Sequence, residues 1–228
     1  MLVLAIDCAL DACAAAVLES ETGSIVASET RLMARGHAEA LMPLIARVMD
    51  EAAVEFKELD RIAVTVGPGS FTGLRVGISA ARGIALAAGK PAIGVTTLSA
   101  LAAPHIAEHG QSPVMAAIDA RHEHVYVQVF APGGRSLVPP RIATLREAAR
   151  AAASGNARIV GSAAVLVAQA WPKGELPPVA LDQRAAPDIA WIARLGAAGT
   201  DTGSSPRPLY LRGPDAVPQP TSAKLKRR

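Results

Sequence analysis

The residues with the clearest chemical potential form a glycine-rich segment in the first half of the chain. The segment is Gly67-Pro68-Gly69-Ser70-Phe71-Thr72-Gly73, and it lies between an apolar run and a helical pattern. Helix N-termini in this position often bind phosphate. However, the segment lacks the Gly-Lys-Ser/Thr ending of a Walker A loop, and Thr72 stands where a dinucleotide fingerprint has its third glycine. A tight structural turn is therefore the favoured interpretation, and an anion site is the alternative.

An acidic residue, Asp7, directly follows the apolar run of residues 2–6. In proteins of the sugar-kinase and actin type, the turn after such an acid clasps a nucleotide phosphate, and that role favours glycine as the next residue. Cys8 stands there in this chain. The sequence therefore argues against nucleotide binding by the isolated chain.

Two histidine pairs have spacings that could place two imidazoles on one metal ion. His105 and His109 are four residues apart on a predicted helix, and His122 and His124 alternate on a predicted strand. Neither pair has further ligands that the sequence identifies. We therefore interpret all four as exposed side chains and predict no metal site.

The two cysteines, Cys8 and Cys13, are too few for a disulfide framework or a four-cysteine zinc site. No histidine in the sequence is an obvious partner that would make either thiol a nucleophile. We therefore expect both to pack as small apolar residues, and we predict no catalytic residue in this chain.

The elements that would position these residues form an internal duplication. An apolar strand ends in Asp7 and another ends in Asp119, and each is followed by a polar turn and a second apolar strand. Further along each half, a strand, a glycine and a helix follow, with Gly67 in the first half and Gly161 in the second. The repeat predicts an α/β fold of two lobes, each with a mixed sheet.

Two predicted helices in the first half, at 37–53 and 72–88, carry more apolar surface than one sheet can cover. Met42 and Met49 widen the apolar face of the first helix, and small residues recur at every fourth position of the second. The main stripes consist of Leu41, Leu44, Ile45, Val48 and Ala52, and of Gly73, Gly77, Ala81 and Ala85. We expect an oligomer or partner interface here, and packing against the sheet is the alternative.

Charge is concentrated at the end of the chain. The 228 residues include 23 lysines and arginines against 20 acidic residues, and segment 213–228 alone holds four basic residues and one acidic residue. The rest of the chain is therefore close to neutral, unlike most nucleic-acid-binding domains. We expect 213–228 to be a disordered, solubilising basic tail, with weak RNA contact as the alternative. No leader or membrane-spanning run is visible, so we expect a cytoplasmic protein with no membrane partner.

Five separated motifs over residues 1–212 resemble the signatures of the TsaB family, also called YeaZ. The first extends the glycine-rich segment through Arg75 to Gly77. The others are Ile6-Asp7 with Ala12-Cys13, Lys90-Pro91 with Gly94-Val95-Thr96-Thr97-Leu98, Ile118-Asp119-Ala120-Arg121 with Val125-Tyr126, and Pro208-Leu209-Tyr210-Leu211-Arg212.

The resemblance implies the two-lobed fold of the actin, sugar-kinase and Hsp70 superfamily, with lobes at 1–103 and 104–212. It also implies a non-catalytic scaffold of the complex that makes N6-threonylcarbamoyladenosine in tRNA. Such a subunit would bind and activate its paralogue TsaD, work with the ATPase TsaE, and form a homodimer when TsaD is absent. It would reach tRNA through the complex, and nucleotide only at its joint with TsaD.

In TsaD, two histidines hold the metal, and Thr97 and Leu101 occupy the matching positions here. This difference argues against a glycoprotease-like metallopeptidase, and Cys8 after Asp7 argues against a small-molecule kinase of the same fold. The family's partner interface uses the two helices described above, so the resemblance implies that nine residues of these helices contact the partner. They are Leu41, Leu44, Ile45, Val48, Gly73, Leu74, Gly77, Ile78 and Ala81. We expect Gly77→Leu to break partner binding and leave the monomer folded.

Overall fold

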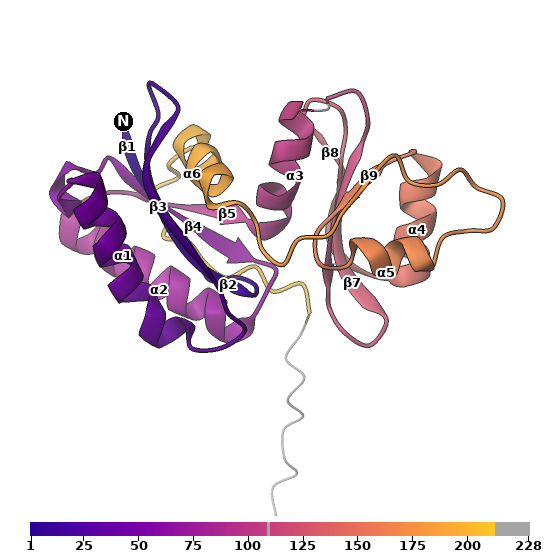
Figure 1. Ribbon diagram of the computed structural model, residues 1–228, viewed down its shortest axis with the longest axis horizontal. Coiled ribbons are helices and arrows are strands. Elements are labelled where there is room, and N and C mark those ends of the chain that lie inside the picture. The colour runs from indigo at the N-terminus through magenta and orange to yellow at the C-terminus, as the bar shows by residue number, and fades with distance from the viewer. Residues whose placement is uncertain (109, 213–228) are drawn as a thin grey trace, which may run out of the picture.

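The computed structural model describes residues 1–108 and 110–212, which form two lobes side by side (Figure 1). The predicted basic tail and His109 lie outside these residues. Each lobe is built around one five-stranded mixed sheet with helices on its faces. Within the described ranges, no helix is both long enough and apolar enough to cross a bilayer.

The sheet of the first lobe has the strand order β3-β2-β1-β4-β5. Its central strand β1 (Leu2–Asp7) pairs antiparallel with β2 (Ala12–Glu19) and parallel with β4 (Arg61–Gly67). The outer strands are β3 (Ser24–Leu32) and β5 (Ala92–Thr96). The parallel carboxyl ends of β1 and β4 therefore lie next to each other, and both run into signature motifs.

The sheet of the second lobe repeats this arrangement, with the order β8-β7-β6-β9-β10. Its central strand β6 (Val114–Asp119) pairs antiparallel with β7 (His124–Phe130) and parallel with β9 (Arg158–Val160). The outer strands are β8 (Ser136–Thr144) and β10 (Leu181–Asp182). The predicted duplication and the two-lobed α/β fold are thus confirmed.

Helices cover both faces of the first sheet, which explains why β1 is apolar along its whole length rather than alternating. Helices α1 (His37–Ala52) and α2 (Phe71–Ala88) pack on the face that carries Leu4 and Ile6 of β1. The short 3₁₀ helix η1 (Phe56–Glu58) follows α1. On the opposite face, Val3 and Ala5 of β1 pack against α6 (Ile189–Ala198).

The second lobe is covered in the same way on a smaller scale. Helices α4 (Leu145–Ser154) and α5 (Ala164–Gln169) pack on the outer face of its sheet. A capping box of Thr144 and Glu147 fixes the start of α4. Helix α3 (Thr97–Glu108) packs on the inner face and also contacts the first-lobe strands β4 and β5. It therefore lies between the two sheets (Figure 1).

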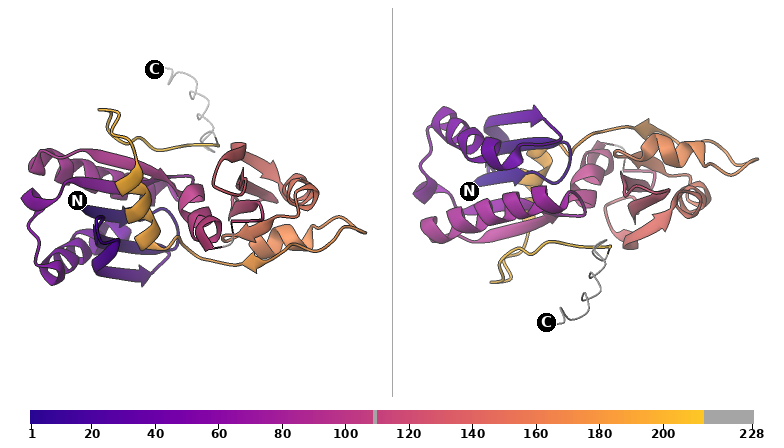
Figure 2. Two further views of the ribbon diagram at one scale, coloured as in Figure 1. Left: turned by 90° about the horizontal axis from the view of Figure 1, so that it is seen from above. Right: turned by 90° about the horizontal axis from the view of Figure 1, so that it is seen from below.

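The structure corrects the expected lobe boundary at residues 103 and 104 in one respect. Helix α6, which follows the second-lobe strands in sequence, packs on the first sheet (Figure 2). Arg61 at the start of β4 fastens the helix, because its Nη1 donates to the carbonyl oxygens of Gly196, Ala197 and Gly199 at 3.2, 3.1 and 2.8 Å. A cation at a helix C-terminus satisfies the last carbonyls and the helix dipole.

Candidate functional site

The glycine-rich loop between β4 and α2 packs directly onto the turn between β1 and β2. The backbone N–H of Ser70 donates to the carbonyl of Ala9 at 2.7 Å. A Cβ atom at Gly69 would overlap the Ala9 carbonyl oxygen, and one at Gly73 would overlap the Cys8 carbonyl oxygen. The side chain of Ser70 caps α2 by accepting the Gly73 N–H at 3.2 Å. The glycines therefore allow two backbone segments to approach closely, in agreement with a structural turn.

Asp7 lies beneath this loop and is fully buried. Its Oδ1 accepts hydrogen bonds from the Thr65 hydroxyl at 2.6 Å and from the Ala9 N–H at 2.9 Å. Burial raises the pKa of this carboxyl, and the two hydrogen bonds and the charge of His37 oppose that effect. The carboxyl therefore connects β1 to β4 and to the β1–β2 turn, and it does not face an open site.

The two cysteines lie in the core of the first lobe, as predicted. Both are buried, and their Sγ atoms are 3.6 Å apart. The neighbouring Cys13 sulfur and burial raise the pKa of the Cys8 thiol. A protonated, buried thiol is a poor nucleophile.

A cleft of about 630 Å³ opens between the lobes. The glycine-rich loop forms one wall, and the turn between β6 and β7 forms the opposite wall. The charged and polar residues that line it are Asp11, His37, Ser70, Asp119, Arg121, His122, Tyr126, Ser162 and Arg212. The cleft thus brings together the glycine-rich, Ile-Asp-Ala-Arg and Leu-Tyr-Leu-Arg motifs, which are far apart in sequence.

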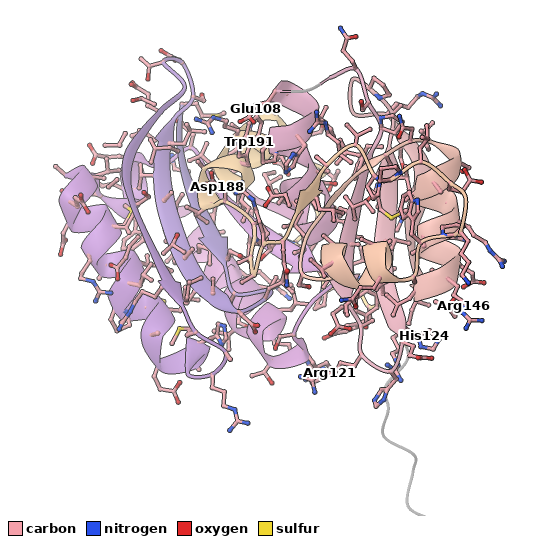
Figure 3. The ribbon with its side chains drawn as sticks, turned by 45° about the vertical axis from the view of Figure 1, so that its right-hand side comes forward. Glu108, Arg121, His124, Arg146, Asp188 and Trp191 are labelled. Carbon is pink, nitrogen blue, oxygen red and sulfur yellow. The ribbon has the colours of Figure 1, made fainter. Side chains whose placement is uncertain are left out.

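The turn between β6 and β7 has an unusual backbone. Arg121, His122 and Glu123 all have positive φ angles, of 62°, 52° and 61°, in a region that non-glycine residues rarely occupy. The Arg121 N–H donates to Asp119 Oδ1 at 2.8 Å, and the His124 N–H donates to the Arg121 carbonyl at 3.0 Å. Figure 3 shows Arg121 at the edge of the molecule near the junction of the lobes. The sequence indicated Arg121 as a motif residue but gave no sign of this conformation.

An exposed aromatic cluster lies next to the cleft. The rings of Phe71 and Tyr210 stack with their centroids 5.6 Å apart and their planes 28° apart. The Arg75 guanidinium lies 3.8 Å from the centroid of the Phe71 ring, and its Nε donates to the Tyr210 hydroxyl at 3.3 Å. We call Phe71, Arg75 and Tyr210 the aromatic platform. Nearby, Arg212 Nη1 donates to the Ala120 carbonyl at 3.2 Å, so the C-terminal motif holds the β6–β7 turn.

The histidines do not converge on a metal site in the described residues. No three His, Cys, Asp or Glu side chains within 1–108 and 110–212 form a group that could hold an ion. His105 Nε2 lies 3.0 Å from Asp182 Oδ2, and His124 Nδ1 lies 2.7 Å from the His122 carbonyl oxygen. The prediction that these histidines are exposed is wrong for His105, whose side chain is only 13% exposed because it packs against Asp182, and His109 lies outside the described residues.

The structure corrects the expected set of interface residues. All nine are buried inside the first lobe: seven have side chains in the core between the sheet and helices α1 and α2, and the two glycines lie against Cys8. The apolar stripes face the sheet, which was the alternative interpretation. A Cβ at Gly77 would lie 3.7 Å from Cys8 Cβ and from Val64 Cγ2. A leucine there would therefore disrupt the core, so Gly77→Leu does not test partner binding in a folded monomer.

The outer faces of the same two helices form an apolar groove of about 770 Å³. We call this the α1–α2 groove. It is lined by Met42, Met49, Asp50, Val54, Glu55, Phe56, Lys57, Ala80, Gly83, Ile84, Ala87 and Ala88. Met42 is 48% exposed and Phe56 is 38% exposed. In the sequence, the flanking stripe of Met42 and Met49 was the signal for this surface.

Comparisons with known proteins agree on one family. The model of the family "TsaD: tRNA N6-adenosine threonylcarbamoyltransferase" matches residues 22–171. The chain is 38% identical to the tRNA threonylcarbamoyladenosine biosynthesis protein TsaB of Escherichia coli, over 55% of this chain and 53% of that protein. It thus spans about half the length of the curated TsaB relatives it matches.

Two further similarities extend over nearly the whole chain. An uncharacterized protein of Mycobacterium tuberculosis is 31% identical over 95% of this chain and 94% of its own length. The solved structure of YeaZ from Pseudomonas aeruginosa is 30% identical, covers 92% of this chain and 99% of its own, and superimposes with a TM-score of 0.78. The resemblance read from the five motifs is therefore confirmed.

Proposed function

The chain belongs to the TsaB (YeaZ) branch of the TsaD family, and from this premise we propose that it is a non-catalytic subunit of the complex that makes N6-threonylcarbamoyladenosine in tRNA. In this role it binds TsaD and keeps it in its active state. The observation that carries the proposal is the α1–α2 groove, an apolar surface left open after the inner faces of both helices have filled the core.

The groove has the composition of a protein interface. Most of its lining consists of methionine, phenylalanine and small residues, and its charged members Asp50, Glu55 and Lys57 lie around η1 and the end of α1. An apolar centre with a polar rim is typical of stable interfaces. We propose that helices of TsaD lie in this groove. An interface of standard size would bury on the order of 1,600 Å² in total.

Two features support a non-catalytic role. Thr97 and Leu101, which match the metal-binding histidines of TsaD, are 0% and 1% exposed in α3, and neither side chain can replace a neutral imidazole as a ligand. In addition, the glycine-rich loop packs over Asp7 and the β1–β2 turn, where related folds hold phosphate.

The proposal is tested by placing a charge in the groove. Met42 and Ala87 are both exposed, so Met42→Glu and Ala87→Glu leave the core intact. We expect each to weaken binding to TsaD by at least 10-fold, because a carboxylate would have to be desolvated in an apolar contact. Isothermal titration with purified TsaD measures the affinity, and tRNA modification by TsaD and the other pathway enzymes measures the consequence.

The matched control is Leu137→Glu, at an exposed apolar position on β8 of the second lobe. This variant should bind TsaD as the parent chain does. Full TsaD binding by both groove variants would refute the assignment of the groove. Full tRNA modification in the complete absence of this chain would refute the role itself.

Without TsaD, we propose that a second copy of this chain occupies the same groove. Sedimentation should then show a concentration-dependent dimer that Met42→Glu converts to a monomer and Leu137→Glu does not. TsaE would join the assembled TsaB–TsaD pair, and nucleotide would bind at their joint. A dimer that persists in both groove variants would place the homodimer contact elsewhere.

A further inference from the structure

The aromatic platform is an unusual feature for this chain. Only 3% of its residues are aromatic, yet Phe71 and Tyr210 are 55% and 47% exposed. Arg75 holds the pair together through the ring of Phe71 and the hydroxyl of Tyr210. The two rings are therefore held in place and about half exposed, and the ring faces that Arg75 and the stacking contact leave uncovered offer a flat surface for a base.

Cations gather around the platform, although the chain as a whole is close to neutral. Arg75 belongs to the platform, and Arg121 and Arg212 line the adjoining cleft. The acidic residues of the cleft are Asp11 and Asp119, and Asp119 accepts the backbone N–H of Arg121. Among the described residues, three guanidinium groups, one of them bonded to the Ala120 carbonyl, thus lie beside two carboxylates and neutral polar groups.

The platform and the cleft form one continuous surface, because Phe71 belongs to both. The hydroxyl groups of Ser70 and Ser162 and the imidazole of His122 extend the polar lining. A base stacked on Phe71 would therefore place its sugar and phosphate at the mouth of the cleft, within the field of Arg121 and Arg212. Arginine suits this role because its guanidinium binds phosphate oxygens bidentately and stays charged.

We propose that the aromatic platform and the adjoining cleft bind a single-stranded segment of RNA, with bases on Phe71 and Tyr210 and phosphates near Arg121 and Arg212. Stacked aromatic rings and a cationic groove are the two components of single-strand recognition. This inference deepens the proposed function, on which it rests for the identity of the RNA as tRNA. Under it, the chain touches the substrate of the complex directly.

Two other occupants fit the observations less well. A free nucleotide would need a phosphate clasp, and the β1–β2 turn is covered by the glycine-rich loop, whose Ser70 N–H is bonded to Ala9. A protein partner would favour an apolar centre, which the α1–α2 groove supplies and the largely polar cleft does not. The nucleotide alternative becomes an outcome of the test, through competition with ATP.

The test is direct RNA binding by the full chain without TsaD. A labelled single-stranded 12-nucleotide RNA is titrated at low salt, and fluorescence anisotropy measures the affinity. Phe71→Leu keeps the apolar bulk and removes the aromatic face, and we expect it to weaken binding about 5- to 100-fold. Arg121→Gln should weaken binding and lower the slope of log affinity against log salt by about one.

The matched control is Phe56→Leu, which removes a half-exposed ring from the α1–α2 groove instead. It should bind RNA as the parent chain does. A second full-length control replaces Lys224, Lys226, Arg227 and Arg228 by glutamine. In this background, Phe71→Leu should still weaken RNA binding. The RNA as a perfect duplex should bind at least 10-fold more weakly, because its bases cannot stack on the platform.

Four results would overturn the proposal. They are no binding of the single strand at low salt, equal binding by Phe71→Leu and the parent chain, equal binding of duplex and single strand, and full displacement of RNA by ATP. Because TsaD is absent from this assay, a negative result for RNA binding leaves the TsaD-binding proposal untouched. Failure of Met42→Glu to weaken TsaD binding likewise leaves the RNA result standing.

Discussion

Gly73 and Gly83 lie on the same helix, α2, but the space around the two glycines differs. The Cys8 carbonyl oxygen occupies the place where a Cβ at Gly73 would lie, whereas nothing lies within 4 Å of a Cβ at Gly83. The close approach of the Cys8 carbonyl therefore requires a glycine at position 73.

We expect Gly73→Ala to destabilise the protein by about 2–3 kcal/mol, because the loop and the β1–β2 turn must move apart. Gly83→Ala should stabilise it by about 0.5–1 kcal/mol through helix propensity. Urea unfolding of the three proteins measures both changes. Equal stability of the two variants would contradict the assigned contact.

Asp7 gives a prediction that depends on pH. Because burial raises its pKa above the ordinary value of 3.8, there is a pH range above 3.8 in which the folded state still binds a proton that the unfolded chain has released. Stability contributed by this group is therefore present below pH 3.8 and falls as pH rises through the folded pKa. Asp7→Asn keeps the Oδ1 acceptor and does not titrate, so its melting temperature should exceed that of the parent by a margin that grows with pH.

Thermal melts from pH 4 to pH 8 measure this margin. Asp119→Asn is the control, because the Asp119 carboxylate is exposed and an asparagine can also accept the Arg121 N–H. Its melting temperature should follow that of the parent chain at each pH. A pH-independent difference between Asp7→Asn and the parent would show that Asp7 does not retain its proton in the folded state.

At the scale of elements, the sequence predicted the central strands and helices α1 and α2 well. Strand β1 is apolar along its length because both of its faces are buried, and α2 ends at Gly89, a left-handed C-cap. The face assignment failed for a physical reason. An amphipathic stripe marks a contact but not its partner, and here the stronger stripe of each helix contacts its own sheet.

The docking of α6 was not predictable from local pattern, because its anchor Arg61 is more than a hundred residues away in the chain. Arg61→Met should loosen α6 and lower stability by about 1–3 kcal/mol, since three carbonyl groups lose their donor. Hydrogen exchange of the α6 amides should increase most. Arg194→Met, at an exposed position on the same helix, is the control, and equal exchange in both variants would contradict the anchoring role.

At the scale of the whole molecule, the chain crosses between the lobes more than once. Helix α3 joins β5 to β6, the segment after β10 returns to α6, and the last described segment joins the lobes again. In that segment the Leu209 N–H donates to Val66 in β4, and Arg212 donates to Ala120 after β6. These bonds explain how motifs that are distant in sequence meet at one cleft. The residue patterns identified each motif as a family signature but could not show that the motifs lie together.

The return of α6 also determines the order in which the molecule can be completed during synthesis. Translation delivers the first sheet with α1 and α2, and then every strand of the second lobe, before Ile189 leaves the ribosome. Until then the β1 side chains Val3 and Ala5 lack their cover. The first lobe, although started first, is the one finished last, and a nascent chain stalled before residue 189 would expose an apolar sheet face to chaperones.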